Sequence, residues 1–447
     1  MMQLNEKYNR EDFLDFLINH FLTDFEKDVR PVNPKGLTII NNASYLGQSK
    51  SLDLHIFELS YSESHANKRV ALAMDGFRIM QSTATFNALV VFNPQNKNKW
   101  RLSLMTASPE KNEKGGVSVH LSNPRRFSFE LGENTKINTP FNFLIKKGGI
   151  SDIEDLKKRF SIEVVNKEFY AQISELFTEL VGGTRGEGRN QRKYSGIIAL
   201  PSVPRESREN HEFAVRLIGR LIFCWFLREK KSASDLPLIS KEILSLEASN
   251  HNPDYYHSIL EPLFFEVLNK PFKLRVEEYR NSLFEKTPYL NGGLFTPRTW
   301  DYYDSKLRYI LNIPDEWIRK LFEVLELYNF TVDENTSVDI DLSIDPEMLG
   351  RIFENLLAEI NPETGETARK ATGSYYTPRT IVDYMVDESL IQYLKDKTSM
   401  DEDKLRVLVS YDLNDDEGYP LKADEKDKVI ESLSKITILD PACGSGA

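Results

Sequence analysis

The chain has 447 residues, 40% of them hydrophobic, and a formal net charge of -11, and its length exceeds one hydrophobic core and predicts two or three domains. Its two cysteines, Cys224 and Cys443, exclude a disulfide framework and a cysteine-rich zinc site and predict a cytoplasmic protein. Neither a signal peptide nor a long apolar run is present, so we expect no export and no membrane span, and the acidic balance excludes a uniformly basic nucleic-acid binder.

The first 150 residues are predicted to form a small α/β domain. An acidic start followed by apolar residues at helical spacing predicts an amphipathic helix over residues 9–29. The period then changes, and the expected elements are strands at 37–40 and 52–59, a helix at 68–81, and strands at 88–92 and 100–105.

Helices are predicted to dominate the rest of the chain. Residues 152–180 carry apolar residues at helical spacing, and the wide apolar stripe over 212–230 predicts a buried helix in a helical domain that ends near residue 338. Between them, the glycine-rich, basic segment 182–193 is expected to be a mobile loop that either orders against a DNA backbone or stays disordered. The acidic segment 398–431 fits a solvated helical hairpin or an insert.

The last residues of the sequence have the pattern of a cofactor site. A short apolar strand at 436–440 leads into the loop Asp-Pro-Ala-Cys-Gly-Ser-Gly at 440–446. Glycines let a backbone approach a ligand closely, and in open α/β sheets ligands bind beyond the carboxyl ends of strands. A Gly-x-Gly pair alone is equally typical of a plain tight turn, so the loop has to be interpreted together with a segment upstream.

Two motifs together resemble the S-adenosylmethionine pocket of adenine-N6 DNA methyltransferases. The loop at 440–446 resembles the first motif of that family, and Thr-Gly-Ser-Tyr-Tyr-Thr-Pro at 372–378 resembles the companion motif that closes over the methionine end of the cofactor. Thr377 can cap the helix that follows and Pro378 suits its first turn, although most Thr-Pro pairs do only that. The resemblance implies cofactor contacts by Tyr376, Thr377, Pro378, Asp440, Pro441, Ala442, Cys443, Gly444 and Gly446, with Tyr375 and Ser445 as second choices.

Segments 217–227, 289–295 and 345–357 look like the helical connector of type IIG restriction-modification enzymes. That resemblance implies a mixed architecture of α/β and all-α parts. The implied parts are a nuclease-like α/β domain (1–150), a helical linker with the basic glycine-rich loop (151–195), a helical connector (196–338), a connector carrying the upstream cofactor motif (339–397), an acidic helical insert (398–435) and the start of a Rossmann-like methyltransferase domain (436–447).

The family resemblance implies methyl transfer from S-adenosylmethionine to adenine N6 in double-stranded DNA, within a type IIG restriction-modification or phage-defence system. The family's catalytic signature, Asn-Pro-Pro-Tyr or a near variant, follows the cofactor loop and holds the flipped adenine, and it is absent from this sequence. We therefore expect an N-terminal portion, cut short inside the methyltransferase domain, that does not methylate DNA alone. The sequence predicts neither the DNA target nor the oligomeric state.

A nuclease of this class needs an acid, and then Glu-x-Lys on the following strand, to hold Mg²⁺ and orient water. The best match is Asp53 with Glu58 as candidate Mg²⁺ ligands. Ser60 takes the lysine position, so Lys68 at the start of the next helix is the candidate replacement. The alternative is that both acids are ordinary polar residues of a half-buried strand, on which His55 alternates with them.

Two further functions are therefore weighed beside the methyltransferase. One is a non-catalytic remnant that binds DNA or a protein partner, and the other is a magnesium-dependent endonuclease using Asp53 and Glu58. Asn-Lys-Arg at 67–69 and Arg78, on the helix beside that strand, either contact phosphates or form a solvated face. The glycine turn at 291–293 is expected to be structural.

Overall fold

The computed structural model describes residues 2–111, 117–186, 188–204, 207–232, 236–290, 293–303, 306, 308–331, 335–336, 338–359, 379–409 and 421–439. The chain divides into two compact units. Unit 1 consists of Met1–Val164, Asn335–Leu342 and Tyr376–Cys443, and unit 2 of Val165–Glu334, Ser343–Tyr375 and Gly444–Ala447. The predicted mixture of α/β and helical parts is therefore confirmed at the level of fold class. Residues 335–342 belong to unit 1, although the residues before and after them in the sequence belong to unit 2.

Unit 1 is built on a seven-stranded mixed sheet in the order β1-β2-β3-β4-β5-β6-β9. Its strands are β1 (Phe25–Pro31), β2 (Ile40–Ser49), β3 (Leu54–Tyr61), β4 (Asn87–Pro94), β5 (Lys99–Lys111), β6 (Val117–Gly132) and β9 (Asp339–Asp341). Neighbours are antiparallel except for the parallel pairs β3–β4 and β6–β9. Helix α2 (Arg69–Ser82) connects β3 to β4, as a parallel pair requires.

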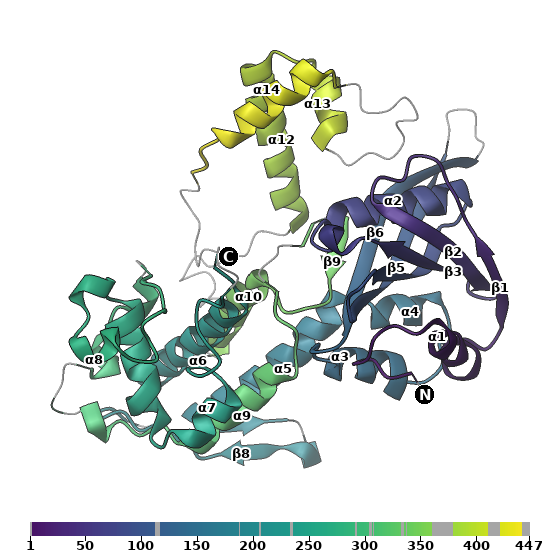
Figure 1. Ribbon diagram of the computed structural model, residues 1–447. Coiled ribbons are helices and arrows are strands. Elements are labelled where there is room, and N and C mark those ends of the chain that lie inside the picture. The colour runs from purple at the N-terminus through teal and green to yellow at the C-terminus, as the bar shows by residue number, and fades with distance from the viewer. Residues whose placement is uncertain are drawn as a thin grey trace. The chain divides into compact units, whose positions relative to one another are not determined.

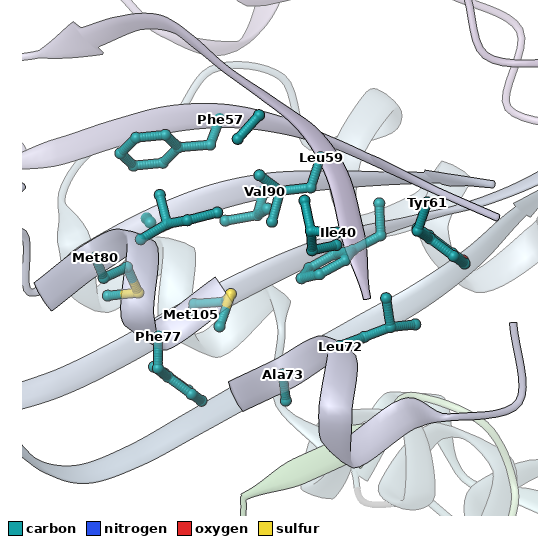
Figure 2. Close-up of a cluster of buried hydrophobic side chains, with 14 of the residues drawn as sticks. Ile40, Phe57, Leu59, Tyr61, Leu72, Ala73, Phe77, Met80, Val90 and Met105 are labelled. Carbon is teal, nitrogen blue, oxygen red and sulfur yellow. The ribbon is translucent and has the colours of Figure 1, made fainter. Parts of the chain in front are cut away.

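Helix α2 covers one face of this sheet (Figure 1). Phe57, Leu59 and Tyr61 alternate along β3 and point to that face, where Leu72 and Phe77 of α2 meet them (Figure 2). All five side chains are at most 2% exposed. The predicted helix at 68–81 is confirmed to within one residue, because its apolar positions recur at helical spacing over a continuous hydrophobic surface.

The opposite face of the sheet carries α1 (Arg10–Phe16), α3 (Asn138–Pro140) and α4 (Ile153–Arg159), as Figure 1 shows. Phe129 on β6 lies 5.1 Å from Phe160 at the end of α4, between ring centroids. Tyr8, just before α1, lies 5.2 Å from Trp100 on β5. The predicted helix at 9–29 is too long: it ends after a π-helical turn at Leu17–Phe21, and its last residues form β1.

Strand β9 is held at the sheet edge by a cluster of buried ion pairs. The Arg69 Nε atom lies 2.8 Å from Asp339 Oδ2, the Arg126 Nε atom 3.0 Å from Asp339 Oδ1, and the Arg101 Nη1 atom 2.7 Å from Asp341 Oδ2. Arg126 is fully buried and its guanidinium lies 4.5 Å from the centroid of the Phe92 ring. Removing one partner of a buried ion pair leaves the other charge buried without compensation, so the sheet edge depends on the two aspartates.

Three further helices of unit 1 form a small cluster of their own: α12 (Arg379–Thr398), α13 (Glu402–Val409) and α14 (Ala423–Ser434). Their shared core contains Ile391, Leu394 and Leu405. Arg406 of α13 joins Glu388 of α12 at 2.6 Å on the surface. The described part of the acidic segment is therefore helical, as the charge pattern predicted.

Unit 2 is helical apart from one hairpin, among its described residues. Its main helices are α5 (Ile162–Val181), α6 (Arg208–Glu229), α7 (Leu246–His251), α9 (Asp315–Glu326) and α10 (Pro346–Glu359), with π-helical segments at Tyr256–Leu260 and Pro262–Leu268. Trp225 on α6 and Trp317 on α9 are both 1% exposed at its centre. Across both units, none of the helices in the described ranges is long and apolar enough to cross a membrane.

The expectation of a mobile loop at 182–193 is wrong for its described residues. They form a two-stranded hairpin of β7 (Gly183–Arg185) and β8 (Arg192–Tyr194). Arg185 donates hydrogen bonds to Ser174 and Thr178 of α5, and the Tyr194 hydroxyl donates to Glu175 at 2.8 Å. Side-chain anchors on α5 therefore order a segment whose composition alone suggested disorder.

Candidate functional site

The two cofactor motifs lie outside the described residues. This applies to Tyr376, Thr377 and Pro378, to Tyr375 and to the loop at 440–446. Two features next to them are described. The described part of helix α12 starts at Arg379, the residue that follows the Thr-Pro pair in the sequence. The predicted strand at 436–440 is wrong for its described residues: residues 436–439 are not in a strand, and Ile438 and Leu439 are 86% and 87% exposed. That the two motifs bind one S-adenosylmethionine molecule together therefore stays a prediction.

Glu58 is the candidate nuclease residue that the fold buries. It lies on β3, on the face opposite α2, and is 7% exposed. Arg10, the first residue of α1, donates from Nη2 to Glu58 Oε1 at 2.6 Å and from Nε to Oε2 at 2.8 Å. The Tyr8 hydroxyl donates to the same Oε2 at 2.7 Å. Both carboxylate oxygens are thus engaged by protein donors in a charge-assisted arrangement.

The two partners of Glu58 keep their protons. The hydrogen bond to Glu58 is the main cause that raises the pKa of Arg10 above its usual value. Burial, and then the charge of Glu58, raises the pKa of Tyr8 far above its usual value. Tyr8 therefore stays a hydrogen-bond donor and Arg10 stays a cation at every physiological pH.

A cavity of about 330 Å³ opens beside this ion pair. It lies between the end of β1, the start of β2 and the end of β3, and it is lined by Arg10, Pro31, Asn33, Asn42, Ala43, Ser44, Glu58 and Ser60. Ser44 pairs with Glu58 across the two strands, and Asn42 pairs with Ser60. We call this cavity the Glu58 pocket. Among the lining residues Glu58 is the one acid and Arg10 the one base, and the other polar residues carry amides or hydroxyls.

The structure does not bring Asp53 to Glu58. Asp53 is exposed in the turn before β3, with a φ of 46°, and five residues of extended chain span roughly 16 Å. Two carboxylates that share one magnesium ion have to lie within about 4 Å of each other, because each binds at about 2 Å. Among the described residues no group of three or more histidine, cysteine or acidic side chains is placed to hold a metal.

Lys68 is exposed and immediately precedes α2, and no ion pair joins it to a described residue. The two arginines of α2, Arg69 and Arg78, already form ion pairs with other residues. Arg69 pairs with Asp339, and Arg78 pairs with Asp75 at 2.7 Å, so neither is a free phosphate ligand. His55 contacts the Tyr45 hydroxyl at 3.2 Å, and burial lowers the pKa of His55, which favours a neutral ring.

Sequence reasoning did not identify Tyr8 and Arg10. They lie 50 and 48 positions from Glu58, and no local pattern links positions so far apart. The nearest local signal is Asn9, whose side chain caps α1 by accepting from the backbone of Glu11 at 2.9 Å. That cap fixes where the helix begins, and therefore where Arg10 is placed.

Comparison with known proteins gives one relative. Over 311 residues the chain is 28% identical to a protein of Methanocaldococcus jannaschii that bears the description "Putative type II restriction enzyme and methyltransferase RM.MjaORFECS2P". The match covers 67% of this chain and 23% of the relative, so the chain spans about a quarter of that protein's length. No family model matches the chain, and no solved structure matches it. The chain is thus a distant relative of a protein described as a type II restriction enzyme and methyltransferase.

Proposed function

We propose that this chain is the N-terminal part of a DNA methyltransferase that transfers a methyl group from S-adenosylmethionine to adenine N6 in double-stranded DNA. We place that enzyme in a type IIG restriction-modification or phage-defence system. The observation that carries the proposal is the pair of motifs at 372–378 and 440–446 in a chain related to the archaeal protein. Either motif alone has a plain structural explanation, whereas a turn and a helix cap have no reason to occur together in these sequences.

The sequence around residue 378 supports the role of the upstream motif. The first backbone N–H groups of a helix have no partner within it, and in the sequence Thr377 and Pro378 stand directly before Arg379, the first described residue of α12. Such groups, together with the Thr377 hydroxyl, suit the carboxylate at the methionine end of the cofactor. On the loop, Gly444 and Gly446 let the backbone approach the rest of the cofactor.

Methyl transfer requires the residues of this chain to position the cofactor and does not require them to activate it. The cofactor supplies a methyl group on a sulfonium, which is already a good leaving group, so the rate depends on how cofactor and adenine are positioned. Tyr376, Thr377, Pro378 and the loop residues would hold the cofactor. The signature that would hold the flipped adenine is not in this sequence. We therefore expect cofactor contact from this chain without methylation of DNA.

Saturation-transfer NMR with excess S-adenosylmethionine tests the proposal, because it detects ligands with a Kd of roughly a millimolar. We expect weak transfer to the cofactor from the wild-type chain, and its loss in Thr377→Val and in Gly444→Leu. Thr184→Val, an exposed threonine on β7, is the matched control and keeps the signal. A wild-type chain without transfer, or equal transfer in all four proteins, refutes the cofactor site.

A further inference from the structure

The residues around Glu58 do not fit the magnesium ion that a nuclease-like domain implies. A two-acid site needs a second carboxylate on a neighbouring strand, but the positions that pair with Glu58 are Ser44 on β2 and Val91 on β4, and neither strand contains an acidic residue. Ser60 stands where the lysine would be. One carboxylate cannot replace the several oxygen ligands that hold Mg²⁺ in a nuclease site.

Arg10 occupies the place on Glu58 that a metal ion would need. Its guanidinium faces both carboxylate oxygens, at 2.6 and 2.8 Å, and Tyr8 adds a third donor at 2.7 Å. The Glu58 side chain is 8% exposed, whereas that of Arg10 is 39% exposed. An ion that bound Glu58 would therefore have to displace a charge-assisted, two-pronged pair from a largely buried carboxylate, and removing one partner of such a pair is costly.

The rest of the pocket offers hydrogen-bond donors without an assigned partner. Neither Asn33, Asn42, Ser44 nor Ser60 hydrogen-bonds through its side chain to another described residue. The Nη1 atom of Arg10 also remains available, because the pair with Glu58 uses Nε and Nη2. Amide, hydroxyl and guanidinium donors that converge on one cavity suit the oxygens of a phosphodiester, and they cannot activate water for its hydrolysis.

We propose that the Glu58 pocket binds a phosphodiester of DNA without a metal ion and without cleaving it, with Arg10 in place of the metal. DNA as the ligand rests on the proposed function, whereas the exchange of metal for arginine rests on the geometry of the pocket. Because Glu58 neutralises Arg10, the pocket contributes hydrogen bonds more than net charge. It therefore positions one phosphate of a duplex that is also held elsewhere.

Binding of a fluorescent duplex of mixed sequence in EDTA, followed by anisotropy over a range of salt concentrations, tests this site. Asn42→Asp puts a negative charge into the pocket at an exposed position, and Asn134→Asp puts the same charge into an exposed turn after β6. We expect Asn42→Asp to weaken binding about tenfold or more and to lower the salt slope by about one, while Asn134→Asp binds like the wild type.

Each of the other outcomes would overturn a different part of the proposal. Equal binding by the two variants overturns the pocket and leaves the proposed function intact. A wild-type chain that binds no duplex in EDTA or in Mg²⁺ overturns DNA as the partner, and binding that requires Mg²⁺ overturns the metal-free site. A separate Mn²⁺ titration followed by thermal unfolding compares wild type with Glu58→Gln. We expect the same response from both, and a stabilisation by Mn²⁺ that Glu58→Gln loses shows that Glu58 does hold a metal.

Discussion

Asp75 of α2 ties the helix to the chain that enters β2, and its removal is expected to unfold that corner. Its carboxylate is fully buried and accepts the backbone N–H groups of Thr38 at 2.9 Å, Ile39 at 2.8 Å and Ile40 at 3.1 Å. Arg78, one turn further along α2, supplies the counter-charge at 2.7 Å. One side chain therefore satisfies three backbone donors at the start of a strand.

The expected loss follows from the two donors that stay buried. Thr38 is exposed and can turn to water, but the amides of Ile39 and Ile40 cannot. A buried amide without an acceptor costs about 1–3 kcal/mol, so Asp75→Ala should lower the free energy of unfolding of unit 1 by about 2–6 kcal/mol. Asp75→Asn keeps one acceptor oxygen and should lose less.

Hydrogen exchange in low urea, followed by mass spectrometry, measures this locally and keeps the two units separate. We expect peptides over residues 37–46 and 69–82 to lose protection in Asp75→Ala, with an intermediate loss in Asp75→Asn. Peptides of unit 2 should not change in either variant. If both variants stay within about 1 kcal/mol of the wild type, the buried carboxylate is not what holds these amides, and the reasoning fails.

Three further predictions concern other buried groups. Burial is the largest influence on the pKa of His257 and lowers it, but the hydrogen bonds to Glu261 at 3.1 Å and to the Leu311 carbonyl at 2.8 Å, with the charge of Glu261, together outweigh burial and raise that pKa. The protonated ring should therefore stabilise unit 2 below about pH 6.5, and this effect should be lost as the pH rises through the folded pKa. In a urea series from pH 5.5 to 8.5 the free energy of unfolding should fall with pH, and His257→Gln should flatten that dependence. Arg220→Met removes the ion pair between Arg220 and the fully buried Asp301 at 2.8 Å, and it should lower the free energy of unfolding of unit 2 by about 3–5 kcal/mol, as measured in urea. Gly132→Ala should lower the melting temperature of unit 1 far more than Gly36→Ala. Both glycines have positive φ, but only at Gly132 would the new methyl group meet a backbone carbonyl, that of Asn98. Similar melting temperatures for the two variants would contradict this.

The sequence predicted the elements whose pattern is local. Helix α2 was predicted because Ala73, Phe77 and Met80 recur at helical spacing, and β4 because its apolar run is continuous. Strand β6 was not predicted, since its middle contains Ser-Asn-Pro-Arg-Arg, which reads as a turn. That stretch is a strand because β5 pairs with it and because Arg126 finds Asp339 across the sheet.

The same limit applies to the candidate sites. Glu58 was identified because a strand with an isolated acid can be recognised in the sequence, but its partner Arg10 could not be, since the contact depends on how α1 is placed on the sheet. The pairing of β2 with β3 brought Ser44 to Glu58, and the register shift between Tyr45 and Gly47 separates this contact from the turn, so counting residues from the turn does not predict it. The cofactor motifs were recognised from the sequence through their resemblance, and their contacts remain to be tested.

The ion pairs of β9 have a consequence for the order in which the protein is made. Arg69 and its partner Asp339 lie 270 positions apart, and all of unit 2 before residue 335 is synthesised between them. At about 5–20 residues per second, a ribosome needs roughly 14–54 s to cover that interval. Until then three arginines gather at the sheet edge without their aspartates, so a nascent chain released before residue 335 should be readily cleaved by trypsin at this edge. The sheet of unit 1 can therefore be completed only after residues 165–334 of the helical unit have been synthesised.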